Sequence, residues 1–196
     1  MTKNASRKLQ KLLTTGIFQA TKAATTDIDG LVNAITAAGA TDCGNLDSND
    51  FSTWAAQRDT STTKLSLAAL NTQERAAGDG DDRVSVWITT EAIYGFFYDI
   101  ATPLERLADK DMAALGFTSL SFNGKPFITD KAVVANYLHG LNENHVWLGS
   151  HSDEDMRYEK PVKPLNQAAE LGQIFWMGNL VCDARRRQVM FTGITS

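Results

Sequence analysis

The sequence predicts an α+β fold. Apolar residues recur at helical spacing before Gly78 and again after Thr90. Short runs in which apolar and polar residues alternate, as in half-buried strands, begin at Arg83 and continue to the C-terminus. These helices and strands do not alternate regularly, as they would in a fold built from βαβ units. At 196 residues, the chain is long enough for one domain or two small ones with a sizeable core.

Two segments near the N-terminus carry clustered apolar residues. Leucines at helical spacing predict a helix from Asn4 to Leu13, which Gly16 can end. Residues 17–47 are rich in Thr, Ala, Gly and Asp, which predicts a loop. One apolar island, residues 28–35, predicts a short ordered segment within that loop.

Two more helices and an acidic turn precede the first strand. Ser48 or Asn49 can cap a short helix that reaches Ala55. Residues 65–77 predict a longer helix, which ends at Gly78. The run GDGDD that follows predicts a turn-rich joint. It lacks the ligand order of an EF-hand calcium loop and the Lys of a phosphate-binding loop.

The middle of the chain predicts a strand, a helix and a hairpin. Residues 83–89 place Val, Val and Ile on one face and predict a strand. Residues 90–116 keep helical spacing, with Pro103 as a kink or restart. Residues 117–122 and 125–129 predict two strands joined at Asn123-Gly124, which is a strong hairpin signal.

The last third predicts strands around one polar loop. Residues 136–141 fit either a strand or a loop, and residues 144–149 predict a strand. Residues 151–164 are polar and contain two prolines, which predicts an exposed loop. Residues 174–182 and 188–194 are apolar and rich in β-branched and aromatic side chains, which predicts a terminal hairpin.

Arg185, Arg186 and Arg187 would lie at the tip of that hairpin. Three guanidinium groups could contact the phosphates of a nucleic acid. A solvated tip that pairs with carboxylates is favoured instead, because the chain has a net charge of −4 and no other basic cluster. In an assembled protein those carboxylates would belong to an adjacent subunit, so the three arginines are candidate inter-subunit contacts.

Charge and cysteine content exclude several classes of partner. A net charge of −4 gives no general attraction to nucleic acid or to anionic membranes. No run approaches the ~18 apolar residues that a membrane-spanning helix needs. Cys43 and Cys182 lack any zinc-type spacing and are predicted to be reduced thiols.

No catalytic, metal or cofactor site is predicted. His139, His145 and His151 are evenly spaced, but Gly149-Ser150 interrupts the strand that would align them, so metal binding is disfavoured. No nucleophile motif and no acid–base constellation stands out. The sequence therefore predicts a protein that is not an enzyme and that uses no cofactor.

Three segments follow one another in a characteristic order along the second half of the chain. The first segment runs from Gly116-Phe117 to Asp130 and includes Leu120, Phe122, Gly124 and Pro126-Phe127-Ile128. The second consists of Leu141-Asn142 with Val146 and Leu148. The third consists of Gly178-Asn179-Leu180 with Cys182 and Arg185 to Gln188. Together they resemble the C-terminal part of the major capsid proteins of tailed bacteriophages and prophages. That family has the coat fold called Hong Kong ninety-seven type, which encapsulins share.

The resemblance implies a structural subunit of an icosahedral phage or prophage capsid that encloses double-stranded DNA. It assigns residues 1–82 to the end of a spine helix and to peripheral-domain segments, residues 83–141 to an axial-type domain, and residues 142–196 to the peripheral sheet. The family's N-terminal arm and extended loop have no counterpart here, so a fragment, a processed product or a truncated prophage gene is expected.

The resemblance also implies partners and a location. The partners are other copies of the chain, as pentamers and hexamers in the full-length form, and packaged DNA bound without sequence specificity; no membrane is involved. The location is the virion capsid, and the cytoplasm of the bacterial host during assembly. Two alternatives stay open: an encapsulin-like compartment shell protein, which would enclose enzymes, and a non-catalytic α+β binding module. A small enzyme ranks third.

Overall fold

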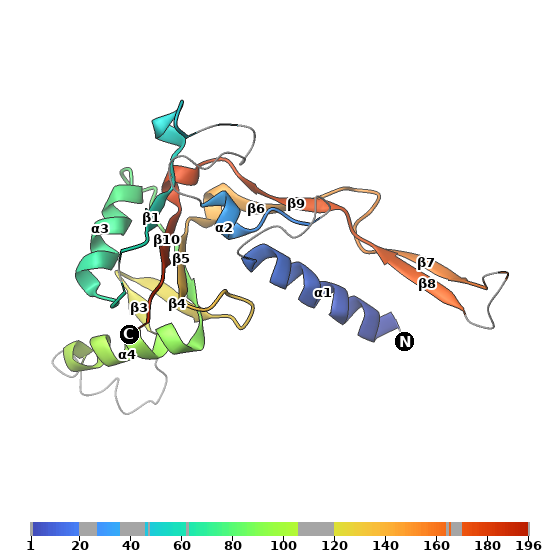
Figure 1. Ribbon diagram of the computed structural model, residues 1–196, viewed down its shortest axis with the longest axis horizontal. Coiled ribbons are helices and arrows are strands. Elements are labelled where there is room, and N and C mark those ends of the chain that lie inside the picture. Colours follow the sequence, from blue (N-terminus) through green and yellow to red (C-terminus); the bar gives the residue numbers. More distant parts are fainter. Residues whose placement is uncertain are drawn as a thin grey trace.

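A mixed six-stranded sheet with helices on both faces forms the body of the molecule (Figure 1). The computed structural model describes residues 2–19, 27–35, 46, 48–61, 63–105, 120–163, 165 and 170–195. The strands lie in the order β1 (Gln57–Asp59), β10 (Val189–Thr192), β5 (Tyr137–Leu141), β2 (Val86–Thr89), β4 (Lys125–Thr129) and β3 (Ser121–Phe122). The β1–β10 and β2–β4 pairs are parallel, and the other pairs are antiparallel.

One face of the sheet packs against two helices, α3 (Leu67–Ala77) and α4 (Glu91–Glu105). Helix α3 begins where the Ser66 side chain accepts a hydrogen bond from the Ala69 N–H, and Gly78 follows its last residue. Aromatic rings fill this layer: Phe127 stacks on Phe97 with ring centroids 4.1 Å apart and lies 5.8 Å from Trp87. The larger of the two core clusters therefore lies between the sheet and these helices.

The opposite face is covered by the end of α1 (Thr2–Phe18) and by α2 (Leu31–Ala34). The alternation of strand residues distributes side chains between the two layers. In β10, for example, Val189 and Phe191 belong to the first cluster, whereas Met190 belongs to the second. All four residues of β10 are buried, because this strand is covered on both faces and paired at both edges.

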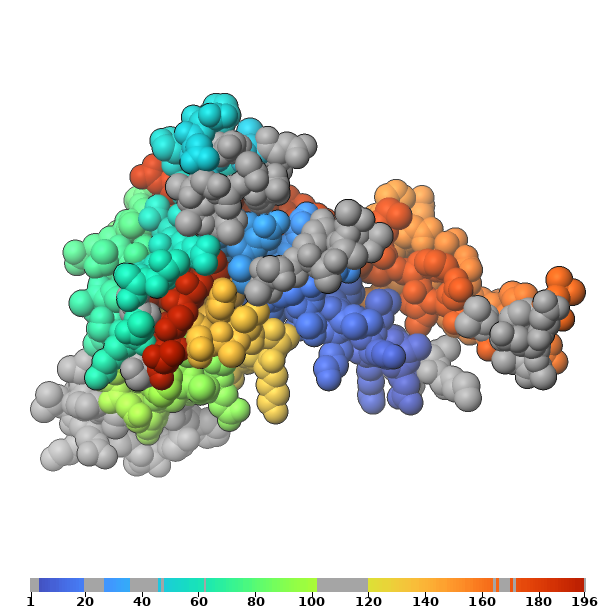
Figure 2. Space-filling model, viewed as in Figure 1, coloured from blue at the N-terminus to red at the C-terminus, as the bar shows by residue number. Residues whose placement is uncertain are grey.

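A long two-stranded ribbon, residues 146–182, extends away from the body beside α1 (Figure 1). Its inner part pairs β6 (Val146–Ser150) with β9 (Gly178–Cys182), and its outer part pairs β7 (Arg157–Val162) with β8 (Leu171–Phe175). The two parts are linked where the His151 N–H donates to the Met177 carbonyl and the Met177 N–H donates to the Glu154 carbonyl. The space-filling view shows the ribbon projecting clear of the sheet (Figure 2).

Several predicted elements are confirmed. The helix predicted for residues 4–13 is present and continues past Gly16 to Phe18. The helix over 65–77, the strand within 83–89 and the ordered segment within 28–35 are also present. Residues 136–141, which fit either a strand or a loop from the sequence, contain strand β5. The hairpin at Asn123-Gly124 has positive φ angles of 51° and 77°, which these two residue types tolerate best.

Other predictions for the N-terminal two thirds need correction. Residues 52–54 form a single 3₁₀ turn preceded by Phe51, so the helix capped by Ser48 or Asn49 is wrong. Helix α4 runs through Pro103 to Glu105, while the continuation predicted for 106–116 and the strand start at 117–119 lie outside the described residues. Cys43 lies outside them too, and Cys182 is a buried free thiol.

Two predictions for the C-terminal third are wrong. The segment 151–164, predicted to be a loop, contains strand β7, whose residues are all exposed. Such a strand has no buried face, so it shows no apolar alternation. The predicted terminal hairpin does not form either: β8 pairs with β7, β9 pairs with β6, and β10 lies between β1 and β5. The predicted division at residues 82 and 141 stays a prediction; the six-stranded sheet takes strands from all three segments.

Candidate functional site: the junction between sheet and ribbon

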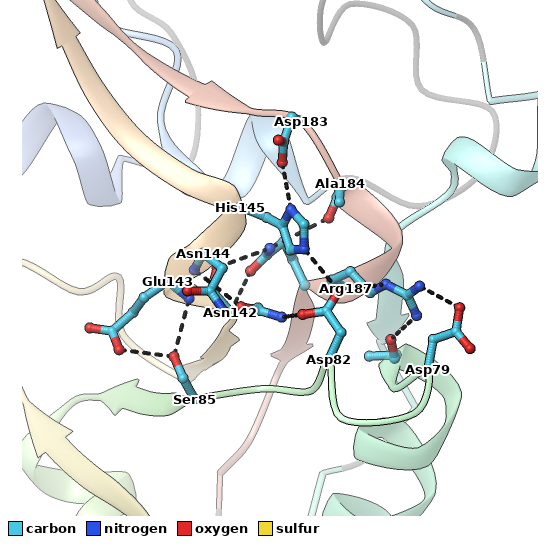
Figure 3. A network of polar contacts seen from close by, with 12 residues as sticks. Asp79, Asp82, Ser85, Asn142, Glu143, Asn144, His145, Asp183, Ala184 and Arg187 are labelled. Atoms are coloured by element: carbon cyan, nitrogen blue, oxygen red, sulfur yellow. Dashed lines mark hydrogen bonds and ion pairs between the residues drawn. The ribbon is translucent and has the colours of Figure 1, made fainter.

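A polar network fills the place where the chain passes from the sheet to the ribbon and returns (Figure 3). The chain leaves β5 through Asn142 and the 3₁₀ turn η3 (Glu143–His145), and it returns through Asp183, Ala184 and the 3₁₀ turn η4 (Arg185–Arg187). Both crossings lie against the loop between α3 and β2, residues 78–85. We call these three segments the junction.

Two buried amides connect the crossings to each other. Asn142 and Gln188 are both fully buried. The Asn142 N–H donates to Gln188 Oε1 at 2.9 Å, and Gln188 Nε2 donates to the carbonyl oxygens of Asn142 and Ala184 at 3.4 Å. Asn142 Nδ2 also donates to Asp82. Buried amides are costly unless they are hydrogen-bonded, so these contacts determine the separation of the two crossings.

His145 bridges two carboxylates from different parts of the chain. Its Nδ1 lies 2.8 Å from Asp183 Oδ1, and its Nε2 lies 2.8 Å from Asp82 Oδ2. The hydrogen bond with Asp82 is the largest cause of a raised pKa for His145; partial burial lowers the pKa, and the contact with Asp183 raises it further. The imidazole therefore favours its protonated form in this environment.

Arg187 ties the second crossing to the end of α3. Its Nη1 donates to the Ala77 carbonyl at 3.2 Å, its Nη2 lies 2.6 Å from Asp79 Oδ2, and its Nε lies 3.2 Å from Asp82 Oδ2. A guanidinium at this carbonyl end satisfies a group that the helix leaves without an internal partner. For Asp82, desolvation raises the pKa, but contacts with His145, Asn142 and Arg187 outweigh it, so the pKa lies below its usual value.

Ser85 connects the first crossing to the segment that precedes β2. Ser85 Oγ donates toward the Leu141 carbonyl at 3.1 Å and toward Glu143 Oε2 at 3.0 Å, and the Glu143 N–H donates to Ser85 Oγ at 3.1 Å. A hydroxyl has one hydrogen, so its donation is shared between these two acceptors. The first crossing is thereby held to the segment that leads into β2.

The three arginines predicted to lie together at a hairpin tip have three different environments. Arg185 is fully buried; its Nε donates to the Ala34 carbonyl at 2.7 Å, and its guanidinium lies 5.8 Å from the Trp54 ring centroid. Arg187 is bound within the junction, and Arg186 is exposed. The prediction of a solvated tip is therefore wrong, because η4 lies inside the fold rather than at the end of a hairpin. The inter-subunit role stays a prediction.

The three histidines are not brought together. His139 lies fully buried in β5 beside Phe18, His145 lies in the junction, and His151 is exposed at the bend of the ribbon. Among the described residues, no group of three or more His, Cys, Asp and Glu side chains could hold a metal ion. The acidic turn predicted at residues 78–82 is present, and its Asp79 and Asp82 contact Arg187.

The junction could not be found by scanning for motifs. His145 is separated from Asp82 by 63 positions and from Asp183 by 38 positions. The sequence does place a charged or amide residue beside each strand end. Such residues are also common in ordinary loops, so they do not by themselves indicate a site. Within the part of the chain that is described, no helix is long and apolar enough to cross a membrane.

A mixed sheet covered on both faces, with a projecting two-stranded ribbon beside an N-terminal helix, is the α+β fold of a phage capsid protein. A chain from the capsid asymmetric unit of cyanophage A-1(L) has this fold, with a TM-score of 0.68 and 16% identity over 97% of this chain and 66% of that chain. The resemblance predicted from the sequence is thus confirmed for the fold.

A second similar structure is a chain from the procapsid of satellite phage P4, solved with the size determination (Sid) protein. It gives a TM-score of 0.56 and 15% identity over 98% of this chain and 62% of that chain. The chain therefore spans slightly less than two thirds of the length of each of these two. No protein-family model matches the sequence, and no curated protein matches it.

Proposed function

We propose that this chain is a structural subunit of an icosahedral phage or prophage capsid that encloses double-stranded DNA. The observation that carries the proposal is the similarity to two phage capsid structures over nearly the whole chain. Function in such a subunit comes from shape and repeated contacts between copies. We accordingly propose a non-catalytic role, in the virion capsid and, during assembly, in the host cytoplasm.

The surface of the ribbon supports self-assembly. Eight of the thirteen exposed large apolar side chains among the described residues lie between positions 147 and 181, so most of these side chains belong to the ribbon. They are Trp147, Leu148, Tyr158, Val162, Leu165, Phe175, Met177 and Val181. Trp147 and Val181 are a cross-strand pair on one face. Exposed apolar side chains gathered on one projecting element are typical of a protein interface.

We propose that the partner of this surface is a second copy of the chain. Copies that contact one another head to tail close into rings when the rotation between them is right, as pentamers and hexamers would require. The exposed Arg186 is the member of the arginine triplet for which we propose the inter-subunit contact. A net charge of −4 suits an inner wall that binds packaged DNA weakly and without sequence specificity.

The direct test is particle formation. The chain is expressed with and without any coding sequence that precedes it in the gene, and mass is measured by light scattering and shape by negative-stain electron microscopy. Closed particles of uniform size from the longer form support the proposal. A compact monomer from both forms at every concentration contradicts it.

A surface variant tests the role of the ribbon. Val162 is 69% exposed in β7, and Ile128 is 48% exposed in β4 of the sheet. We expect Val162→Lys to raise the concentration at which particles form by about tenfold or more, because a lysine would be desolvated in each contact. The thermal midpoint of the monomer should stay within about two degrees. Ile128→Lys is the matched control, and equal effects of the two variants on particle formation would argue against the ribbon as the interface.

An encapsulin-like compartment is the alternative that shares the proposed shell. The similar chains from cyanophage A-1(L) and satellite phage P4 come from phage capsids, which favours a phage capsid. Neighbouring genes separate the two: a terminase, portal or protease gene supports a phage capsid, and a peroxidase or ferritin-like gene supports a compartment.

A further inference from the structure

We propose that His145 is a proton-dependent latch that joins the two crossings of the junction to the sheet and so controls how firmly the ribbon is held. The proposal starts from the position of the imidazole. Its two ring nitrogens each lie 2.8 Å from a carboxylate oxygen, one on Asp82 in the loop before β2 and one on Asp183 after β9. His145 itself belongs to the first crossing, so one side chain connects all three segments (Figure 3).

The chemistry of this arrangement depends on a proton. An ionised carboxylate only accepts hydrogen bonds, and a neutral imidazole carries a single N–H. Both contacts can be hydrogen bonds only when both ring nitrogens are protonated. Loss of one proton leaves a lone pair facing a carboxylate oxygen at 2.8 Å, which is repulsive. The latch is therefore closed, with both carboxylates hydrogen-bonded, when His145 is an imidazolium. It is open, with one of the two hydrogen bonds lost, when His145 is neutral.

The charged groups around the ring decide which end opens. Asp82 also accepts a hydrogen bond from Asn142 Nδ2 and forms an ion pair with Arg187 Nε. Arg187 in turn forms an ion pair with Asp79. Asp183 is half exposed, and its side chain has His145 as its one hydrogen-bond or ion-pair partner in the described part of the chain. Glu143, the remaining carboxylate of the turn, faces Ser85. Asp82 keeps its contacts with Asn142 and Arg187 after deprotonation, so the contact that is lost is the one between the His145 ring and the Asp183 carboxylate, at the base of β9. The Asp183 N–H still donates to the His145 carbonyl at 3.2 Å, so this loss loosens the crossing without detaching it.

The pH direction follows from the raised pKa of His145. A histidine whose folded pKa lies above its unfolded value of about 6.5 stabilises the folded form fully below that value. The stabilisation is lost as the pH rises through the folded pKa. The ribbon should therefore be held more firmly in mildly acidic solution than in mildly alkaline solution. Any effect of this change on shell geometry rests on the proposed capsid function, whereas the latch itself belongs to the single chain.

The first test is an NMR titration of the imidazole nitrogens in the monomeric chain. The three histidines are assigned, and the ¹⁵N shifts of each ring are followed from about pH 5 to about pH 9. We expect His145 to show the doubly protonated pattern at about pH 6.5 and to titrate above that value. A neutral tautomer at that pH, or a midpoint at or below it, overturns the proposal without any variant.

The second test connects the proton to the ribbon. Amide hydrogen exchange of β6 and β9 is measured over the same pH range and divided by the intrinsic exchange rate at each pH. Protection in the wild type should fall by about threefold to tenfold as His145 deprotonates, because one charge-assisted hydrogen bond at a half-exposed site is lost. His145→Gln should begin at the lower protection and show no such step, since an amide does not titrate.

His151→Gln is the matched control, because His151 is exposed on the same ribbon and its ring nitrogen accepts only from the nearby Asp153 N–H in the described structure. This control should keep the wild-type step. A wild-type protection profile that does not follow the His145 titration, or a step that survives in His145→Gln, overturns the latch. If His145→Gln fails to fold, the wild-type titration and exchange profiles decide alone. All measurements use monomer, so failure of the latch and failure of shell formation are separate results.

Discussion

The buried histidine of β5 predicts that the chain loses stability in mild acid. His139 has no exposed surface, and neither of its ring nitrogens has a hydrogen-bond partner in the described structure. Two aromatic rings lie near it: the ring centroids of Phe18 and Tyr137 are 6.0 and 6.2 Å away. Burial in this apolar setting lowers the pKa of His139 from 6.5 to about 4.

The size of the effect follows from linkage. A histidine that is harder to protonate in the folded state favours unfolding as soon as the pH falls below its unfolded pKa. The cost grows by up to about 1.4 kcal/mol per pH unit between the two pKa values and is complete below about pH 4. With these values, His139 should remove about 2 kcal/mol of the free energy of unfolding between about pH 7 and about pH 4.5.

Urea unfolding at these two pH values measures this contribution. His139→Phe keeps a planar ring near Phe18 and Tyr137 but cannot be protonated, so its loss of stability on acidification should be smaller by about 2 kcal/mol. The comparison uses the change between two pH values, so any packing cost of the variant cancels. His151→Gln, at an exposed site, should lose as much as the wild type. An equal acid loss in His139→Phe and wild type would refute the reasoning.

Three further predictions concern stability at neutral pH, each measured by thermal or urea unfolding of the monomer. Arg185→Met should cost about 3 kcal/mol of stability, since it removes a buried hydrogen bond and a ring contact. Arg186→Gln, at an exposed site, should change stability by less than about 0.5 kcal/mol. Similar values for the two variants would contradict the burial of Arg185. Gly140→Ala should cost about 1–3 kcal/mol or more, because the new methyl would lie 2.6 Å from a Trp87 ring carbon; a neutral effect would argue against this packing. Lys125→Met should cost about 3 kcal/mol, because it leaves the buried Glu74 carboxylate of α3 without its cation. An unchanged unfolding midpoint would show that this ion pair does not contribute to stability.

Elements with local signals were predictable from the sequence. The Asn123-Gly124 turn requires positive φ angles that few other residue pairs accept, so two residues suffice to place it. Helix α3 carries a capping Ser66, apolar residues at helical spacing and a glycine just beyond its end. Each of these signals acts over a few residues, and tertiary structure did not override them.

Strand β7 carries no local sequence signal, for a physical reason. Its sequence, RYEKPV, is exposed on both faces of a two-stranded ribbon, so no alternation of apolar and polar residues marks it. Pro161 is tolerated because a two-stranded ribbon consists only of edge strands. What makes this segment a strand is its pairing with β8, and a pairing partner is not visible in the segment itself.

The sequence by itself determined the fold class, most of the helices, the hairpin turn and the apolar character of β9 and β10. Only the tertiary structure decided which strands pair. Strand β10 lies parallel to β1 and antiparallel to β5, neither of which is its neighbour in sequence. An apolar run records that a strand will be buried, but the choice of partner depends on register and chain closure over many residues. For that reason the arginine triplet, predicted at a hairpin tip, is divided among core, junction and surface, and Asp82, His145 and Asp183 meet at one junction.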